Sequence, residues 1–145
     1  MALTYSLEIE DNIDISEIRK MLMTAPDFSE KNGEIQAVDL RVDITKTKGL
    51  SVLIIEDDFG FSPAISISFR LNKFAEPNAL YKRFMQAVWA VLKVAKGDAV
   101  FLFNGESIIL HRKKNRLYLN EIDCFWFEST LPIEQPYELK IMNII

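Results

Sequence analysis

The chain has 145 residues, carries a net charge of -4 at pH 7, and is 49% hydrophobic and 26% charged. These values exclude a disordered or fibrous chain, and we expect residues 1–145 to form a single globular domain with its own core. The apolar stretches fall short of the roughly 18 residues that suggest a membrane span, so no membrane partner is expected. Cys124 is the only cysteine, which excludes an intrachain disulfide. Because the N-terminus also lacks the pattern of a signal peptide, we expect a cytoplasmic protein.

The first part of the sequence predicts a strand, a short helix and a loop. Apolar and polar residues alternate over residues 3–10, which is typical of a half-buried strand. Asp14 is suited to cap a helix that carries apolar residues at helical spacing and ends before Pro26. Residues 27–33 are polar and are expected to form a loop.

Three further strands are expected before the middle of the chain. Residues 35–45 alternate again, and this pattern predicts one continuous strand. After a turn at 46–49, residues 50–56 are almost uniformly apolar and predict a buried central strand. Residues 64–71 alternate and predict the next strand of the same sheet.

The second half of the sequence predicts a long helix followed by a meander of strands. Pro77 suits the first turn of that helix, and Gly97 suits a left-handed residue at its end. Asn104 and Gly105 form a dipeptide that favours a tight hairpin, because both residues must adopt positive φ. A second turn is expected at 113–115, so the strands on either side of it should pair.

The order of these elements predicts an α+β fold. The aromatic segment 123–127 and a last strand over 137–141 complete the chain. Strands that follow one another without an intervening helix favour antiparallel pairing. We therefore expect a mainly antiparallel sheet packed against one long helix and one short N-terminal helix.

The sequence offers no residues for an obvious enzyme, metal site or cofactor site. His111 is the only histidine, and Cys124 lies among aromatic residues, so neither predicts a nucleophile with a poised base. The paired spacings of zinc ligands are missing, and the five glycines are too far apart for a phosphate-binding loop. We expect no catalytic residues, no metal and no cofactor.

Glu56, Asp57, Asp58 and Phe59 form the first candidate for a partner-binding surface. Three adjacent carboxylates repel one another and should lie in water at the end of the strand predicted over 50–56. Phe59 is expected in the core. Alternatively, it lies beside the acids as an aromatic anchor for a basic partner, since charge complementarity speeds encounter.

Arg112, Lys113, Lys114 and Arg116 form the alternative partner-binding candidate. A solvated turn whose charges protect a strand end is the plainer interpretation. The other interpretation is a contact surface for an acidic partner. A sequence pI of about 5.1 is far from the basic balance of nucleic-acid-binding domains, so nucleic acid is not expected as the partner.

A small-molecule site is a third interpretation. An apolar pocket between the long helix and the sheet, lined by Tyr81, Trp89 and residues 124–127, would suit a small cytosolic ligand-binding protein or an enzyme.

Segments spread along most of the chain carry a family resemblance. They are FGFSPAISISFRLNKF (59–74), GDAVFLFNGE (97–106), LYLN (117–120), FW (125–126) and the opening MALTYSLEIE. Together they resemble the Sit-type immunity proteins of bacterial polymorphic toxin systems. The resemblance implies a small cytosolic protein that binds and neutralises a cognate toxin domain. It brings no catalytic motif and implies no particular toxin-contacting residues.

Overall fold

Three helices and nine strands make up the part of the chain that the structure describes. The computed structural model describes residues 2–25, 28–72, 74, 77–105, 107–120 and 135–142. The helices are α1 (Ile15–Thr24), α2 (Leu50–Phe59) and α3 (Pro77–Val94). The strands are β1 (Ala2–Ile9), β2 (Ser29–Lys31), β3 (Glu34–Ala37), β4 (Leu40–Lys46), β5 (Ile65–Asn72), β6 (Ala99–Phe103), β7 (Ser107–Lys113), β8 (Arg116–Asn120) and β9 (Tyr137–Lys140).

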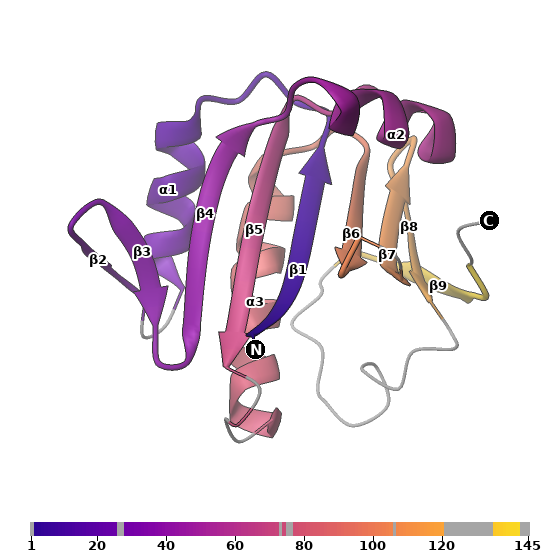
Figure 1. Ribbon diagram of the computed structural model, residues 1–145. Helices are drawn as coiled ribbons and strands as arrows, with labels where there is room; N and C mark the ends of the chain where they lie inside the picture. Colours follow the sequence, from indigo (N-terminus) through magenta and orange to yellow (C-terminus); the bar gives the residue numbers. More distant parts are fainter. Residues whose placement is uncertain are drawn as a thin grey trace.

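The strands form one sheet in the order β2-β3-β4-β5-β1-β6-β7-β8-β9. Neighbouring strands are antiparallel, except that β8 and β9 run parallel. β1 lies in the middle of the sheet and pairs with β5 from Ala2 opposite Asn72 to Ile9 opposite Ile65. The fold is therefore α+β with a mainly antiparallel sheet, as the sequence predicts (Figure 1).

The helices α1 and α3 cover one face of the sheet, and the main core lies between them and the strands (Figure 1). Tyr5 and Phe69 point to this face, and their rings contact Phe84 of α3 at centroid distances of 4.8 and 4.9 Å. α1 contributes Ile18 and Leu22, which are buried in the same core. The alternation predicted for β1 and β5 therefore separates core-facing residues from residues on the other face.

The helix α2 covers part of the opposite face of the sheet, over β6 and β7 (Figure 1). Val100 and Leu102 alternate with the core-facing residues of β6, so their side chains point away from α3. Ile55 and Phe59 of α2 pack with them and with Ile108 in a second buried cluster. This packing fixes α2 to the sheet.

The prediction of a buried strand over 50–56 is wrong, because this segment begins α2. Gly49 has a φ of 68° and lies at the N-terminal end of the helix. The pattern misleads because Ile55 faces the sheet whereas Leu53 and Ile54 face solvent. A short apolar run of this kind fits a buried strand or a helix equally well by periodicity.

Two hairpin turns precede β4, and the sequence analysis did not predict either. Asn32 and Gly33 have φ values of 54° and 80° and join β2 to β3. Val38 and Asp39 join β3 to β4, and Asp39 has a φ of 64°. The single strand predicted over 35–45 is therefore wrong, since it is divided between β3 and β4 by this turn.

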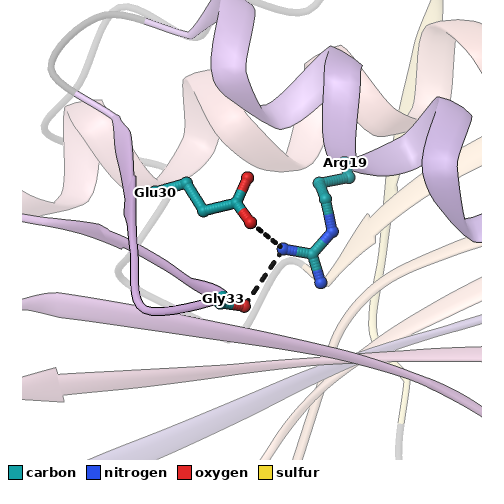
Figure 2. A network of polar contacts seen from close by, with 3 residues as sticks. All are labelled: Arg19, Glu30 and Gly33. Carbon is teal, nitrogen blue, oxygen red and sulfur yellow. Dashed lines mark hydrogen bonds and ion pairs between the residues drawn. The ribbon is translucent and has the colours of Figure 1, made fainter.

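The loop predicted over 27–33 is also partly strand, because it contains β2. Arg19 of α1 holds the β2–β3 hairpin against the helix. Its Nη1 atom donates hydrogen bonds to Oε1 of Glu30 at 3.2 Å and to the carbonyl oxygen of Gly33 at 3.1 Å (Figure 2). Both charged side chains are more than one-third exposed, so this ion pair adds little to stability.

The turns predicted in the second half of the chain are confirmed. Asn104 and Gly105 have φ values of 54° and 70° and join β6 to β7. Lys114 and Asn115 have φ values of 50° and 66° and join β7 to β8. Positive φ at both central residues is the geometry of a tight hairpin turn. The predicted last strand is present as β9, whereas the aromatic segment 123–127 lies outside the described residues.

Gly97 serves a different purpose from the one predicted. Its φ is not in the left-handed region, and α3 already ends at Val94. A Cβ atom at this position would overlap the backbone carbonyl oxygen of Glu10. The absence of a side chain thus lets the chain pass close to the end of β1, where the N–H of Gly97 donates to Oδ2 of Asp11 at 3.4 Å.

Candidate partner-binding surface

The residues of the first candidate surface lie on two sides of α2, one exposed to solvent and one packed on the sheet. Glu56, Asp57 and Asp58 are exposed in the last turn of the helix. Phe59 is only 7% exposed, and its ring meets the imidazole of His111 edge-on with centroids 5.4 Å apart. Phe59 therefore anchors α2 to the sheet, as the core interpretation of the sequence expects, while the three acids lie at the surface.

The three carboxylates lie at the end of α2 where a helix favours positive charge. The last backbone carbonyls of a helix carry partial negative charge, so acids beside them lower its stability. The last turn of α2 contains no basic residue, and the described residues form no ion pair with these carboxylates. Glu56 accepts a hydrogen bond from Oγ of Ser62 at 3.3 Å. The charges of Asp57 and Asp58 are directed toward solvent.

An apolar patch lies on the same helix. Leu50, Leu53 and Ile54 are 70%, 62% and 50% exposed. Their i, i+3, i+4 spacing places them on one side of α2, opposite the buried Ile55. We call these three side chains the apolar face of α2. The pattern of 50–56 does not reveal this face, because a buried strand would place the same residues in the core.

A depression of about 580 Å³ lies between the end of α2, β7 and the end of β9. Asp57 and Asp58 line it together with Lys113 and Lys140. Lys113 belongs to the second candidate surface, so the structure brings part of each candidate to the same place. Acidic and basic side chains therefore line one depression, although they are more than fifty residues apart in the chain.

His111 also lines this depression and is half-buried beside α2. Its Nε2 atom is buried and makes no hydrogen bond within the described part of the chain. Burial lowers the pKa of His111, and the positive charge of Lys113 lowers it further against the opposing effect of Asp98. The imidazole is therefore neutral at pH 7.

The second candidate surface is not continuous. Arg112 is 2% exposed. Its guanidinium donates to the carbonyl oxygen of Leu92 in the last turn of α3 and to those of Ala95 and Gly97 in the segment after the helix, with Nε 3.0 Å from the Gly97 oxygen. Lys113, Lys114 and Arg116 are exposed around the β7–β8 turn. Of the four residues in this candidate, Lys113, Lys114 and Arg116 are therefore placed to meet a partner, and Arg112 is not.

A second depression, of about 820 Å³, lies between α3 and the β8–β9 end of the sheet. Trp89, Arg116 and Tyr137 are among the residues that line it. Trp89 is 6% exposed, and its Nε1 atom has no hydrogen-bond partner among the described residues. The pocket predicted from the sequence included Trp89, whereas the side chain of Tyr81 and residues 124–127 lie outside what the structure describes.

Glu8 is a buried carboxyl that the sequence analysis did not single out. It lies on the face of β1 that points away from α3 and is 8% exposed. Oγ of Ser66 donates to it at 2.8 Å, and Oγ1 of Thr47 donates at 3.4 Å. Burial raises the pKa of Glu8, and these hydrogen bonds oppose the rise. The group ties β1 to β5 and to the chain that follows β4.

The described residues contain no group of three or more His, Cys, Asp or Glu side chains that could hold a metal ion. Nor does any helix within the described ranges have the length and apolar character needed to cross a membrane.

The fold and its surface define a small α+β domain that presents a helix with an apolar and acidic outer side. The chain belongs to the SitI3-like family, whose model matches residues 3–130. The matched region extends from β1 through β8 and therefore includes α2. No curated protein and no solved structure matches the chain.

Proposed function

We propose that the protein is an immunity protein, which binds a cognate bacterial toxin domain in the cytoplasm and neutralises it by stoichiometric inhibition. The observation that carries the proposal is the match to the SitI3-like family over residues 3–130. The name of this family is consistent with the Sit-type immunity proteins that segments of the chain resemble. In this function the protein covers a surface of the toxin and performs no chemical step.

The exposed acids Glu56, Asp57 and Asp58 are the proposed contact for the toxin. No described residue forms an ion pair with these carboxylates. They lie at the C-terminal end of α2, where negative charge lowers the stability of the helix. A toxin that acts on nucleic acid needs a basic cleft to bind phosphates, and these acids would complement it. Lys113, Lys114 and Arg116 remain the alternative contact, suited to a toxin with an acidic surface.

Co-expression tests the function itself. The toxin tested is the C-terminal domain of a large toxin-like protein, where one is encoded next to this gene, and it is expressed in a sensitive host with and without the protein. Restored growth, together with a stable complex of the two purified proteins, supports the proposal. Continued killing at equal expression levels contradicts it.

Charge reversal tests the acidic contact. Replacing Glu56, Asp57 and Asp58 by lysine should weaken toxin binding by more than about tenfold, mainly through slower association at low salt. The matched control is Glu17→Lys, which changes an exposed acid on α1. Unchanged association kinetics in the triple variant would remove the acidic contact and leave the immunity function in place.

The depression beside Trp89 favours a second candidate function, the binding of a small molecule. Its volume of about 820 Å³ is within the usual range for ligand sites. The indole N–H of Trp89, which has no partner among the residues that the structure describes, could donate to a ligand oxygen. A ligand screen by thermal shift tests this function. A rise in Tm that Trp89→Phe abolishes supports it, whereas a screen without any shift counts against it.

A further inference from the structure

The apolar face of α2 is unusual for a helix that packs on its own sheet. A surface helix normally turns its apolar side to the core and its polar side to water. In α2 the buried side is formed by Ile55 and Phe59, yet Leu50, Leu53 and Ile54 remain exposed on the other side. Contiguous exposed apolar side chains rimmed by polar residues mark interaction sites in soluble proteins.

The acids of α2 border this apolar face at its C-terminal end. At about 100° per residue, Asp57 falls between Leu53 and Ile54 in angle around the helix, one turn further along. Glu56 and Asp58 fall on its two flanks. The helix therefore presents an apolar strip that is followed, toward its C-terminal end, by three acidic side chains. One of them lies in line with the strip and one lies on each flank.

This arrangement of apolar and acidic side chains does not stabilise α2 in the isolated protein. Leu50, Leu53 and Ile54 are at least half exposed, so they gain little from the folded state of the isolated protein. Acids in the last turn oppose the helix dipole. Both features become favourable once a partner covers the apolar strip and places cations near the helix end.

The helix is also held in a fixed position. Phe59 and Ile55 are 7% and 5% exposed in the cluster with Val100, Leu102 and Ile108. Gly60 adopts a φ of 76° and its N–H donates to the carbonyl oxygen of Glu56, which terminates the helix. A rigid helix loses little conformational entropy on binding, which favours affinity.

We propose that α2 is the element that the toxin recognises, with its apolar face seated in an apolar groove of the toxin whose rim carries lysine or arginine side chains. This inference rests on the proposed immunity function and specifies its mode of recognition, that of an amphipathic helix in a groove. A second copy of this chain is disfavoured as the occupant, because two α2 helices would bring six carboxylates together. A basic rim on the toxin groove would complement the negative charges of Glu56, Asp57 and Asp58.

The test uses the 145-residue protein and the toxin domain that the co-expression experiment identifies as its partner. The double variant Leu53→Ser/Ile54→Ser is compared with the wild type in binding kinetics. We expect affinity to fall by at least about thirtyfold, with most of the loss in faster dissociation, because these side chains are desolvated anchors. The charge-reversal variants should act mainly on association, so the two sets of variants separate in their kinetics.

Matched controls come from exposed apolar residues elsewhere. Leu139 on β9 and Val38 in the β3–β4 turn are 50% and 66% exposed, which brackets the exposure of Leu53 and Ile54. Leu139→Ser and Val38→Ser should bind the toxin as the wild type does. Since all four positions are exposed, urea midpoints of the variants should stay near that of the wild type.

A measurement without any substitution provides a second test. Amide hydrogen exchange over 50–59 should slow when the toxin domain is added to the wild-type protein. Unchanged exchange there, or wild-type binding by the Leu53→Ser/Ile54→Ser variant, would overturn the inference while toxin binding itself still supported the immunity function. A wild-type protein that does not bind the toxin domain at all would remove both. A dimer in sedimentation that the double variant dissociates would also overturn it, by identifying a second copy as the occupant.

Discussion

Arg112 of β7 closes the C-terminal end of α3 by donating a hydrogen bond from Nη1 to the carbonyl oxygen of Leu92 at 2.8 Å. Its Nε atom donates to the carbonyl oxygen of Gly97 at 3.0 Å, and Nη2 donates to that of Ala95. The last carbonyls of a helix have no partner within the helix. A buried guanidinium therefore satisfies them and also places a positive charge at the negative end of the helix dipole.

Replacing Arg112 by methionine should destabilise the protein by about 2–4 kcal/mol, because several buried carbonyls lose a charged donor at once. Urea denaturation measures this loss. Arg116→Met is the control, since Arg116 is exposed at the first position of β8, directly after the turn, and should change stability by no more than about 0.5 kcal/mol. Equal midpoints for the two variants would contradict the structural role of Arg112.

Gly97→Ala should destabilise the protein by about 2–3 kcal/mol, because the added methyl group would overlap the carbonyl oxygen of Glu10. Gly60→Ala provides a comparison in which the added methyl group causes no steric overlap. A Cβ atom at Gly60 meets nothing within 4 Å, but the φ of 76° costs about 1–2 kcal/mol for a residue with a side chain. We expect Gly97→Ala to be the more damaging substitution in thermal denaturation, and the reverse order would contradict the close approach.

His111 should make stability depend on pH in the mildly acidic range. Its pKa in the folded protein lies below its ordinary value of 6.5, mainly because of burial. The unfolded chain therefore binds the proton more readily than the folded protein. The stability that neutral His111 contributes is complete above pH 6.5 and is lost as the pH falls through the folded pKa.

The measurement is the urea midpoint from about pH 7 to pH 5 for the wild type and for His111→Leu. The difference between the two isolates His111, since Glu8, whose pKa is raised by burial, titrates in both. The wild type should lose more stability than the variant as the pH falls. Lys113→Gln should reduce the loss, because Lys113 lowers the pKa of His111. Parallel curves for the wild type and His111→Leu would show that His111 titrates normally.

The β7–β8 turn can be improved. Lys114 and Asn115 adopt positive φ, a geometry for which Asn-Gly is the favoured pair. The double substitution Lys114→Asn/Asn115→Gly should raise stability by about 0.5–1 kcal/mol. The hydrogen bond from the N–H of Lys114 to Oδ1 of Asp98 at 2.9 Å uses the backbone and survives the change. A Tm equal to or below that of the wild type would contradict the prediction, and Lys46→Asn, outside any positive-φ turn, should give no gain.

The fold class, the strand over 64–71 and the turns of the second half were predictable because their signals are local. The Asn104-Gly105 turn and the alternation of 64–71 each predict the observed element. The Asn32-Gly33 turn carries the same dipeptide signal and was missed, because the polar residues before it favoured a loop. The segment 50–56 could not be assigned from its pattern, since its apolar residues face both the sheet and solvent.

The candidate surfaces were harder to predict because burial is decided by tertiary packing. Arg112 is one of four basic residues that lie close together in the sequence. Unlike the other three it is buried, because its guanidinium donates to a carbonyl at the C-terminal end of α3. Phe59 follows three exposed acids and is itself buried, because one residue further along a helix turns the side chain by about 100°. The apolar face of α2 became visible only once 50–59 was known to be helical.

Titration of the toxin domain with the purified protein is the decisive test of stoichiometric inhibition. We expect toxin activity to fall in proportion to the protein added and to be abolished at one equivalent, because each protein molecule occupies one toxin surface. The Leu53→Ser/Ile54→Ser variant should need a large excess to reach the same inhibition. Inactivation of many toxin molecules by each molecule of the protein, or undiminished toxin activity at excess protein, would contradict it.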